Sequence, residues 1–120
     1  MNPSGVICYM RTVPGRPKHR VLTRPLPATN FDGSDGFIPA GFEWNGASSG
    51  LFAPIFPRWN HPIASCRHDW RCRHARSAAE RKWADEEFRA DVGRTSWWIT
   101  RQIGYLGVRV GAALGIGVHY

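Results

Sequence analysis

The distribution of proline divides this chain into two halves that need different kinds of secondary structure. The sequence contains nine prolines, and all but Pro62 lie before residue 60. Proline interrupts helices and the interior strands of sheets, so the first half can hold only short strands and turns. The second half has no proline after Pro62, so it can form long helices. The sequence therefore predicts an α+β fold, with a strand-rich half followed by a helical half.

Short apolar runs separated by turn residues predict the strands of the first half. We expect them at Cys8–Val13, Arg20–Leu26, Phe37-Ile38 and Phe42–Trp44. Together they would form a small antiparallel sheet. Residues 45–60 combine glycine, serine and proline with large apolar side chains, which favours a loop packed onto the core.

The second half has the pattern of three helices. The first is expected over residues 61–76, because proline is well tolerated in the first turn of a helix. The second is expected over residues 77–93, where Ser77 and Glu80 match a capping box. The third begins around Ser96 and continues into the glycine-rich tail. The first two would form an antiparallel helical hairpin.

A chain of 120 residues can bury one modest core, so we expect a single domain over residues 1–120. Residues 1–60 would form its strand-rich and loop-rich half, and residues 61–120 its helical half. No segment is typical of a membrane-spanning helix, since the uncharged run at residues 110–120 is too short. Residues 1–15 lack the apolar stretch of a secretory signal. Three cysteines are an odd number, which argues against a disulfide framework and favours a reducing compartment.

The expected hairpin would place His68 opposite Asp85, because the two residues are equally far from the turn at Arg76-Ser77. Asp85 lies beside the apolar stripe of its helix, so its carboxylate would be partly desolvated and need a hydrogen-bond partner. An imidazole across the interface meets that need. The carboxylate would fix the tautomer of a neutral His68 and leave the other ring nitrogen as an acceptor. Such a pair is one form of general base, and a purely structural buried pair is the alternative.

The first helix also carries four residues of zinc-ligand type, namely Cys66, His68, Cys72 and His74. On one continuous helix these side chains diverge, so we do not expect them to converge on zinc. Asp69 follows the histidine directly and points away round the helix. It is either a metal ligand or the partner of Arg73 in a surface ion pair.

Three motifs, in this order and spacing, resemble an uncharacterised family of small proteins common in tailed phages and prophages. They are Gly41–Ser48, Cys66–Trp70 and Ala84–Phe88. The family pattern is a P-A-G-F strand, a D-G-A-S loop, an H-D helix, a D-x-x-F helix and a last helix with an aromatic, Val-Arg and Gly. Tyr105, Val108-Arg109 and Gly111 fit that last helix, so the resemblance covers roughly residues 37–111. It implies a virion or tail protein, or one in the host cytoplasm during assembly, with other phage structural proteins as partners.

The same order of motifs resembles the secreted phospholipase A2 of prokaryotes, which has a D-G-C-S-type loop, a C-x-x-H-D-type helix and a D-x-x-F helix. The resemblance implies that His68 activates water and that Asp85 orients it. It also implies that Asp69 binds calcium together with the loop at Asn45 and Gly46. Calcium prefers oxygen ligands and would stabilise the oxyanion of an attacked ester. Asn45 departs from both families, which usually have aspartate there, and the chain lacks the disulfides of the phospholipase.

Two functions follow from these resemblances. One is calcium-assisted hydrolysis of lipid esters in the bacterial envelope. The other is a structural or interaction role in the phage particle, in its tail or head–tail region, where the His-Asp pair only locks the hairpin.

The net charge of +7 indicates acidic partners, such as nucleic acid, anionic lipid or an acidic protein surface. Around the expected hairpin, arginines alternate with acidic residues, and pairing between successive helical turns accounts for many of them. Nucleic acid is therefore the less favoured partner. Residues 1–31 contain no acidic residue and are the better candidate for contact with an acidic partner. Their basic residues are Arg11, Arg16, Lys18, Arg20 and Arg24.

Glycine recurs every four residues in the tail, at Gly107, Gly111 and Gly115. This spacing gives a groove that another helix or a lipid surface can approach closely. Ordinary packing within the fold is the favoured interpretation. The alternatives are packing between subunits of a homo-oligomer and shallow contact with a membrane.

Overall fold

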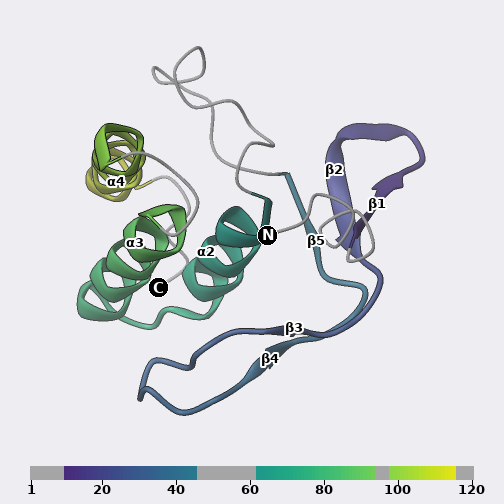
Figure 1. Ribbon diagram of the computed structural model, residues 1–120, viewed down its shortest axis with the longest axis horizontal. Helices are drawn as coiled ribbons and strands as arrows, with labels where there is room; N and C mark the ends of the chain where they lie inside the picture. Colours follow the sequence, from purple (N-terminus) through teal and green to yellow (C-terminus); the bar gives the residue numbers. More distant parts are fainter. Residues whose placement is uncertain (1–9, 46–61, 94–97, 116–120) are drawn as a thin grey trace. The chain divides into compact units, whose positions relative to one another are not determined.

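The computed structural model describes residues 10–45, 62–93 and 98–115 (Figure 1). The chain divides into two compact units, Met1–Gly46 and Ala47–Tyr120. The first unit contains the strands and the second contains the helices. The predicted α+β class is therefore confirmed, whereas the expected single domain over the whole chain stays a prediction.

The larger sheet of the first unit is antiparallel and has the strand order β1-β2-β5. Its strands are β1 (Met10–Val13), β2 (Arg16–Leu22) and β5 (Glu43–Trp44). The turn between β1 and β2 contains Gly15 at a φ of 77°, a left-handed conformation that glycine adopts without steric cost. The ladder is irregular between Thr12, which pairs with Arg20, and Val13, which pairs with Arg16.

A second antiparallel pair is formed by β3 (Leu26–Pro27) and β4 (Phe37–Ile38). The expected strand at Arg20–Leu26 is wrong in its extent, because β2 ends at Leu22 and β3 begins at Leu26. Pro25, between them, has no N–H to donate to a ladder, which favours this break. The buried apolar side chains of the unit come from both strand pairs and their flanks; they are Val21, Leu22, Leu26, Ala28, Ile38 and Trp44.

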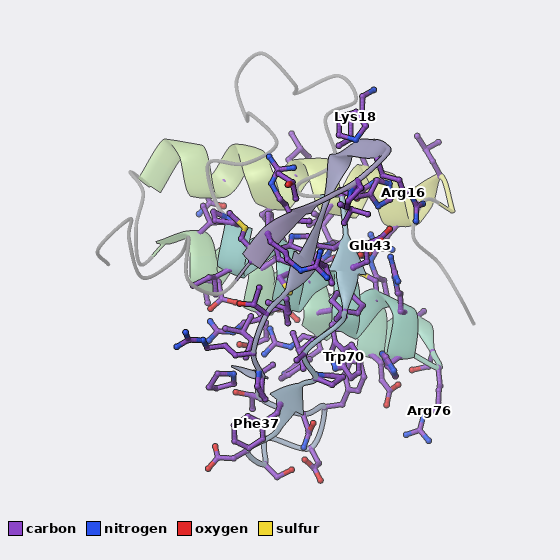
Figure 2. All side chains as sticks on the ribbon, turned by 90° about the vertical axis from the view of Figure 1, so that its right-hand side faces the viewer. Arg16, Lys18, Phe37, Glu43, Trp70 and Arg76 are labelled. Carbon is purple, nitrogen blue, oxygen red and sulfur yellow. The ribbon has the colours of Figure 1, made fainter. Side chains whose placement is uncertain are left out.

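Opposite charges are paired on the larger sheet. Glu43 of β5 accepts a hydrogen bond from Arg16 and lies 2.8 Å from Nδ1 of His19, both on β2 (Figure 2). Lys18 lies near this group toward one end of the unit, whereas Phe37 of β4 lies toward the other end (Figure 2). Cys8, where the first strand was expected to begin, lies outside the described residues.

The second unit consists of α2 (Pro62–His74), α3 (Ala78–Gly93) and α4 (Trp98–Ala113). Helices α2 and α3 form the predicted antiparallel hairpin, and α4 packs on α3 (Figure 1). A small apolar cluster of Ala64, Phe88 and Val92 holds the hairpin together, and Val108 of α4 packs against it. Within the described ranges, no helix has both the length and the apolar character needed to cross a membrane.

The helix ends follow their local chemistry. Ser77 Oγ accepts the N–H of Glu80 at 3.2 Å, as the capping box predicts. The Glu80 carboxylate, however, accepts the N–H of Arg76 at 2.8 Å instead of that of Ser77. At the other end of the unit, α4 includes Gly107 and Gly111 of the glycine-rich tail and ends at Ala113. Gly115, at a φ of 79°, donates its N–H to the carbonyl of Ala112 and ends the helix.

Candidate functional site

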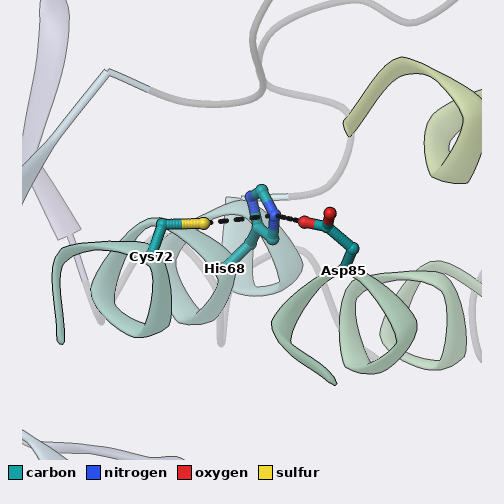
Figure 3. A group of neighbouring side chains, drawn as sticks. All are labelled: His68, Cys72 and Asp85. Carbon is teal, nitrogen blue, oxygen red and sulfur yellow. Dashed lines mark hydrogen bonds and ion pairs between the residues drawn. The ribbon is translucent and has the colours of Figure 1, made fainter. Parts of the chain in front are cut away.

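His68 on α2 and Asp85 on α3 meet across the hairpin, as their distances from the turn predict (Figure 3). The Nε2 atom of His68 lies 2.7 Å from Oδ1 of Asp85. The Asp85 side chain is 0% exposed and that of His68 is 15% exposed. The ring of Phe88 lies 4.9 Å from the imidazole, centroid to centroid, and supports it from α3. The hairpin therefore holds one ring nitrogen of His68 against a buried carboxylate.

Two arginines complete the surroundings of this carboxylate. Arg81, one turn earlier on α3, donates from Nε to Oδ1 of Asp85 at 2.9 Å. Arg109 of α4 donates from Nη1 to Oδ2 at 2.8 Å. Each of the three helices therefore supplies Asp85 with one basic partner. These two contacts were not predicted, although the four-residue spacing of Arg81 and Asp85 is typical of an ion pair on one helix.

The two ring nitrogens of His68 have different surroundings. The Sγ atom of Cys72, one turn after His68 on α2, lies 3.4 Å from Nε2 (Figure 3). Nε2 therefore faces both the thiol and the carboxylate. Among the residues that the structure describes, Nδ1 of His68 has no hydrogen-bond partner. This nitrogen is therefore the candidate for proton exchange with a bound molecule.

The surroundings of His68 act on its pKa in opposite directions. Burial favours the neutral ring, but the hydrogen bond to Asp85 and the contact with Cys72 outweigh it and raise the pKa of His68 to about 9. A raised pKa favours the protonated ring, and the neutral state expected from the sequence stays a prediction. Burial alone would raise the pKa of Asp85, but His68 and Arg81 outweigh it and hold that pKa below its usual value.

Ligand atoms of His68, Cys72 and Asp85 lie within 4.8 Å of one another, so this group could hold a metal ion. An imidazole and a thiol are ligands typical of zinc and not of calcium. The group contains two of the four zinc-type residues of α2 and not the other two, Cys66 and His74. The Nδ1 atom of His74 instead forms a hydrogen bond with the carbonyl of Trp70 at 2.8 Å. Burial raises the pKa of the Cys66 thiol and so disfavours the thiolate that zinc requires.

The residues expected to bind calcium belong to different parts of the chain: Asp69 is in the helical unit and Asn45 in the strand-bearing unit. Asp69 forms an ion pair with Arg73, Oδ2 to Nη2, at 3.0 Å. Asn45 is the last described residue of the strand-bearing unit, and Gly46 lies outside the described residues. The calcium site at these three residues therefore stays a prediction.

A second ionic layer of the hairpin was not predicted. Arg67 of α2 donates to Oδ1 of Asp91 on α3 at 3.2 Å. The buried guanidinium of Arg71 lies 3.8 Å from Oδ2 of Asp91 and 5.1 Å from the ring centre of Trp83. These contacts fix the register of α2 against α3 independently of His68. Comparison of the chain with protein-family models, curated proteins and solved structures finds no match. The inferences below therefore rest on the geometry of the hairpin and on the resemblance of its motifs.

Proposed function

We propose that the protein is a phage or prophage hydrolase, associated with the virion or its tail, that cleaves lipid esters of the bacterial envelope. His68 is the general base and Asp85 the carboxylate that orients it. The observation that carries the proposal is the 2.7 Å contact of Nε2 with a fully buried carboxylate on a ring that is itself 15% exposed. This arrangement leaves Nδ1 as the nitrogen that faces a substrate.

The proposed reaction begins with the neutral imidazole, whose Nε2–H donates to Asp85. Nδ1 takes a proton from a water molecule, and the water oxygen forms a bond to the ester carbonyl carbon. The resulting tetrahedral oxyanion collapses, the bond to the alcohol oxygen breaks, and Nδ1 returns its proton to that oxygen. A fatty acid and a lysolipid leave. Asp85 stabilises the transient imidazolium throughout.

Calcium is the cofactor implied by the resemblance to phospholipase A2, with Asp69, Asn45 and Gly46 as its ligands. When bound, it would supply positive charge to the carbonyl oxygen of the ester. Of these three residues, Asp69 is the one with a carboxylate, and this carboxylate is paired with Arg73 in the structure. Calcium would have to displace this arginine. Binding should therefore be tested directly, by calorimetric titration of wild type and Asp69→Asn.

The test of hydrolysis is release of fatty acid from vesicles of phosphatidylethanolamine and phosphatidylglycerol, with and without calcium, at pH 7 to 10. We expect release by the wild type and a loss of roughly 100-fold or more in His68→Ala. His74→Ala is the matched control, because His74 lies on the same helix and bonds only to a backbone carbonyl in the described residues. Undiminished release by a folded His68→Ala, or none by the wild type, would exclude this mechanism.

A structural role in the phage particle is the second candidate. It is favoured by the three basic partners that Asp85 draws from three helices, since such a group can serve to lock the fold. In that case His68→Ala lowers the free energy of unfolding, no lipid is cleaved, and the protein copurifies with particles at fixed stoichiometry.

A further inference from the structure

We infer that Arg109 of α4 is a positioning residue for the His68–Asp85 pair: it fixes the plane of the carboxylate so that Oδ1 faces the imidazole. The inference deepens the proposed hydrolase and rests on it for its catalytic consequence. The effect of Arg109 on the orientation of His68 follows from the contacts of Asp85 and does not depend on the proposed activity.

An aspartate carboxylate does not hold its own orientation. The torsion that turns its plane is broad and roughly two-fold, so donors on both oxygens are needed to fix it. Oδ1 of Asp85 receives His68 and Arg81. Oδ2 receives Arg109 at 2.8 Å, and no other described residue donates to it. Without Arg109, the buried oxygen would lose its donor, and the carboxylate would turn to find another.

The position of Arg109 is itself well determined. Its neighbour Val108 packs on the apolar cluster of Ala64, Phe88 and Val92. The carbonyl of Val108 accepts a hydrogen bond from Nη2 of Arg81 at 3.1 Å. The backbone of α4 is therefore anchored directly before Arg109, by apolar packing and by the same arginine that touches Asp85.

Arg109 and Arg81 differ in what their removal would do. The Arg81 side chain is 4% exposed and also supports the backbone of α4, so its loss would damage the fold. The Arg109 side chain is 35% exposed, and Asp85 is its described partner. Its removal can therefore misplace the carboxylate while leaving the three helices packed. Misplacement of a catalytic group by about 1 Å can lower a rate by roughly 100-fold.

The variant that tests the inference is Arg109→Gln, whose shorter side chain cannot reach Oδ2 in the same geometry. We expect kcat to fall by roughly 10- to 100-fold while KM stays within about two-fold, because orientation and not substrate binding is affected. Arg89→Gln is the matched control. Arg89 lies 4.2 Å from the ring centre of Tyr105 and joins the same two helices without touching Asp85. It should leave both constants unchanged.

Proton NMR of the His68 Nε2–H provides a measurement that needs no activity. We expect a strongly deshielded resonance in the wild type, an unchanged one in Arg89→Gln, and a shifted or broadened one in Arg109→Gln. An unchanged His68 resonance in folded Arg109→Gln overturns the inference. If the wild type cleaves no ester, the proposed function fails, but this measurement still decides the role of Arg109. Should Arg109→Gln fail to fold, Arg109→Met carries the same test, because its unbranched side chain has no donor for Oδ2.

Discussion

A single histidine gives this protein a stability that depends on pH. The pKa of His68 rises from 6.5 to about 9 on folding. A raised pKa means that the folded state binds the proton more tightly, so the stabilisation is fully present below pH 6.5 and is lost as the pH rises through 9. We expect the free energy of unfolding to fall by up to about 3 kcal/mol over this window. Urea unfolding at several pH values measures it.

The matched variant for this measurement is His68→Gln, which retains a polar side chain and does not titrate. Its free energy of unfolding should change little over the same window once other groups are accounted for. Identical pH dependence in the two proteins would show that the ring proton does not contribute to stability.

The same proton sets the pH dependence of the proposed reaction in the opposite direction. Only the neutral imidazole can accept a proton at Nδ1, so kcat/KM should rise with pH and level off above about 9. Rates of fatty acid release between pH 6 and pH 10 measure this profile. A midpoint near 6.5, the ordinary pKa of histidine, would mean that Asp85 does not stabilise the imidazolium in the functional protein.

At the scale of the elements, the start of α3 depends on one hydroxyl. Ser77 Oγ satisfies the N–H of Glu80, which has no partner within the first helical turn. Ser77→Ala should therefore lower the free energy of unfolding by about 1 kcal/mol. Glu80→Gln is the control, because an amide oxygen can still accept the N–H of Arg76. Thermal unfolding monitored by circular dichroism distinguishes them, and equal effects would contradict the assignment.

The hairpin was predictable because helical geometry fixes both its turn and its register. The turn near Ser77 determines which residues lie level, and this places His68 opposite Asp85 without further information. Arg109 was not predictable in the same way. It lies on a third helix, and periodicity does not determine how far that helix slides along its neighbours. The raised pKa of His68 was not predictable either, because it depends on a thiol and a carboxylate that both contact one ring nitrogen.

The strands were predicted less well than the helices. Apolar runs locate strand residues such as Phe37-Ile38 correctly, and these form β4. Apolar runs do not determine where a strand stops pairing, because this depends on which backbone N–H groups can donate to the neighbouring strand. Pro25 removes one such group, so the expected strand at Arg20–Leu26 is divided between β2 and β3.

At the scale of the whole molecule, the net charge of +7 should govern encounters with lipid surfaces. Arg11 and Lys18 on β1 and β2 are exposed, and neither has an acidic partner among the described residues. We expect initial rates on anionic phosphatidylglycerol vesicles to fall as sodium chloride rises from about 50 to about 200 mM, because salt screens this attraction. Rates on neutral phosphatidylcholine vesicles should not change.

The control is the double variant Arg11→Gln and Lys18→Gln, which lowers the charge without altering the helical unit. Its rates on phosphatidylglycerol should be lower at low salt and converge with the wild type at high salt. A wild-type rate that does not respond to salt would place the determinant of lipid binding elsewhere.

The meeting of three helices at one carboxylate also constrains how this sequence can diverge during evolution. Exchange of Asp85 leaves its basic partners without a counterpart, and exchange of one base removes a donor from a buried carboxylate, so each single change is destabilising. Intermediates on such a route are selected against, so the partners should persist or disappear as a set. That set consists of His68, Arg81, Asp85 and Arg109. Homologous sequences that retain Asp85 should therefore retain all three basic residues. Sequences that have lost Asp85 should show substitutions at the three basic positions as well.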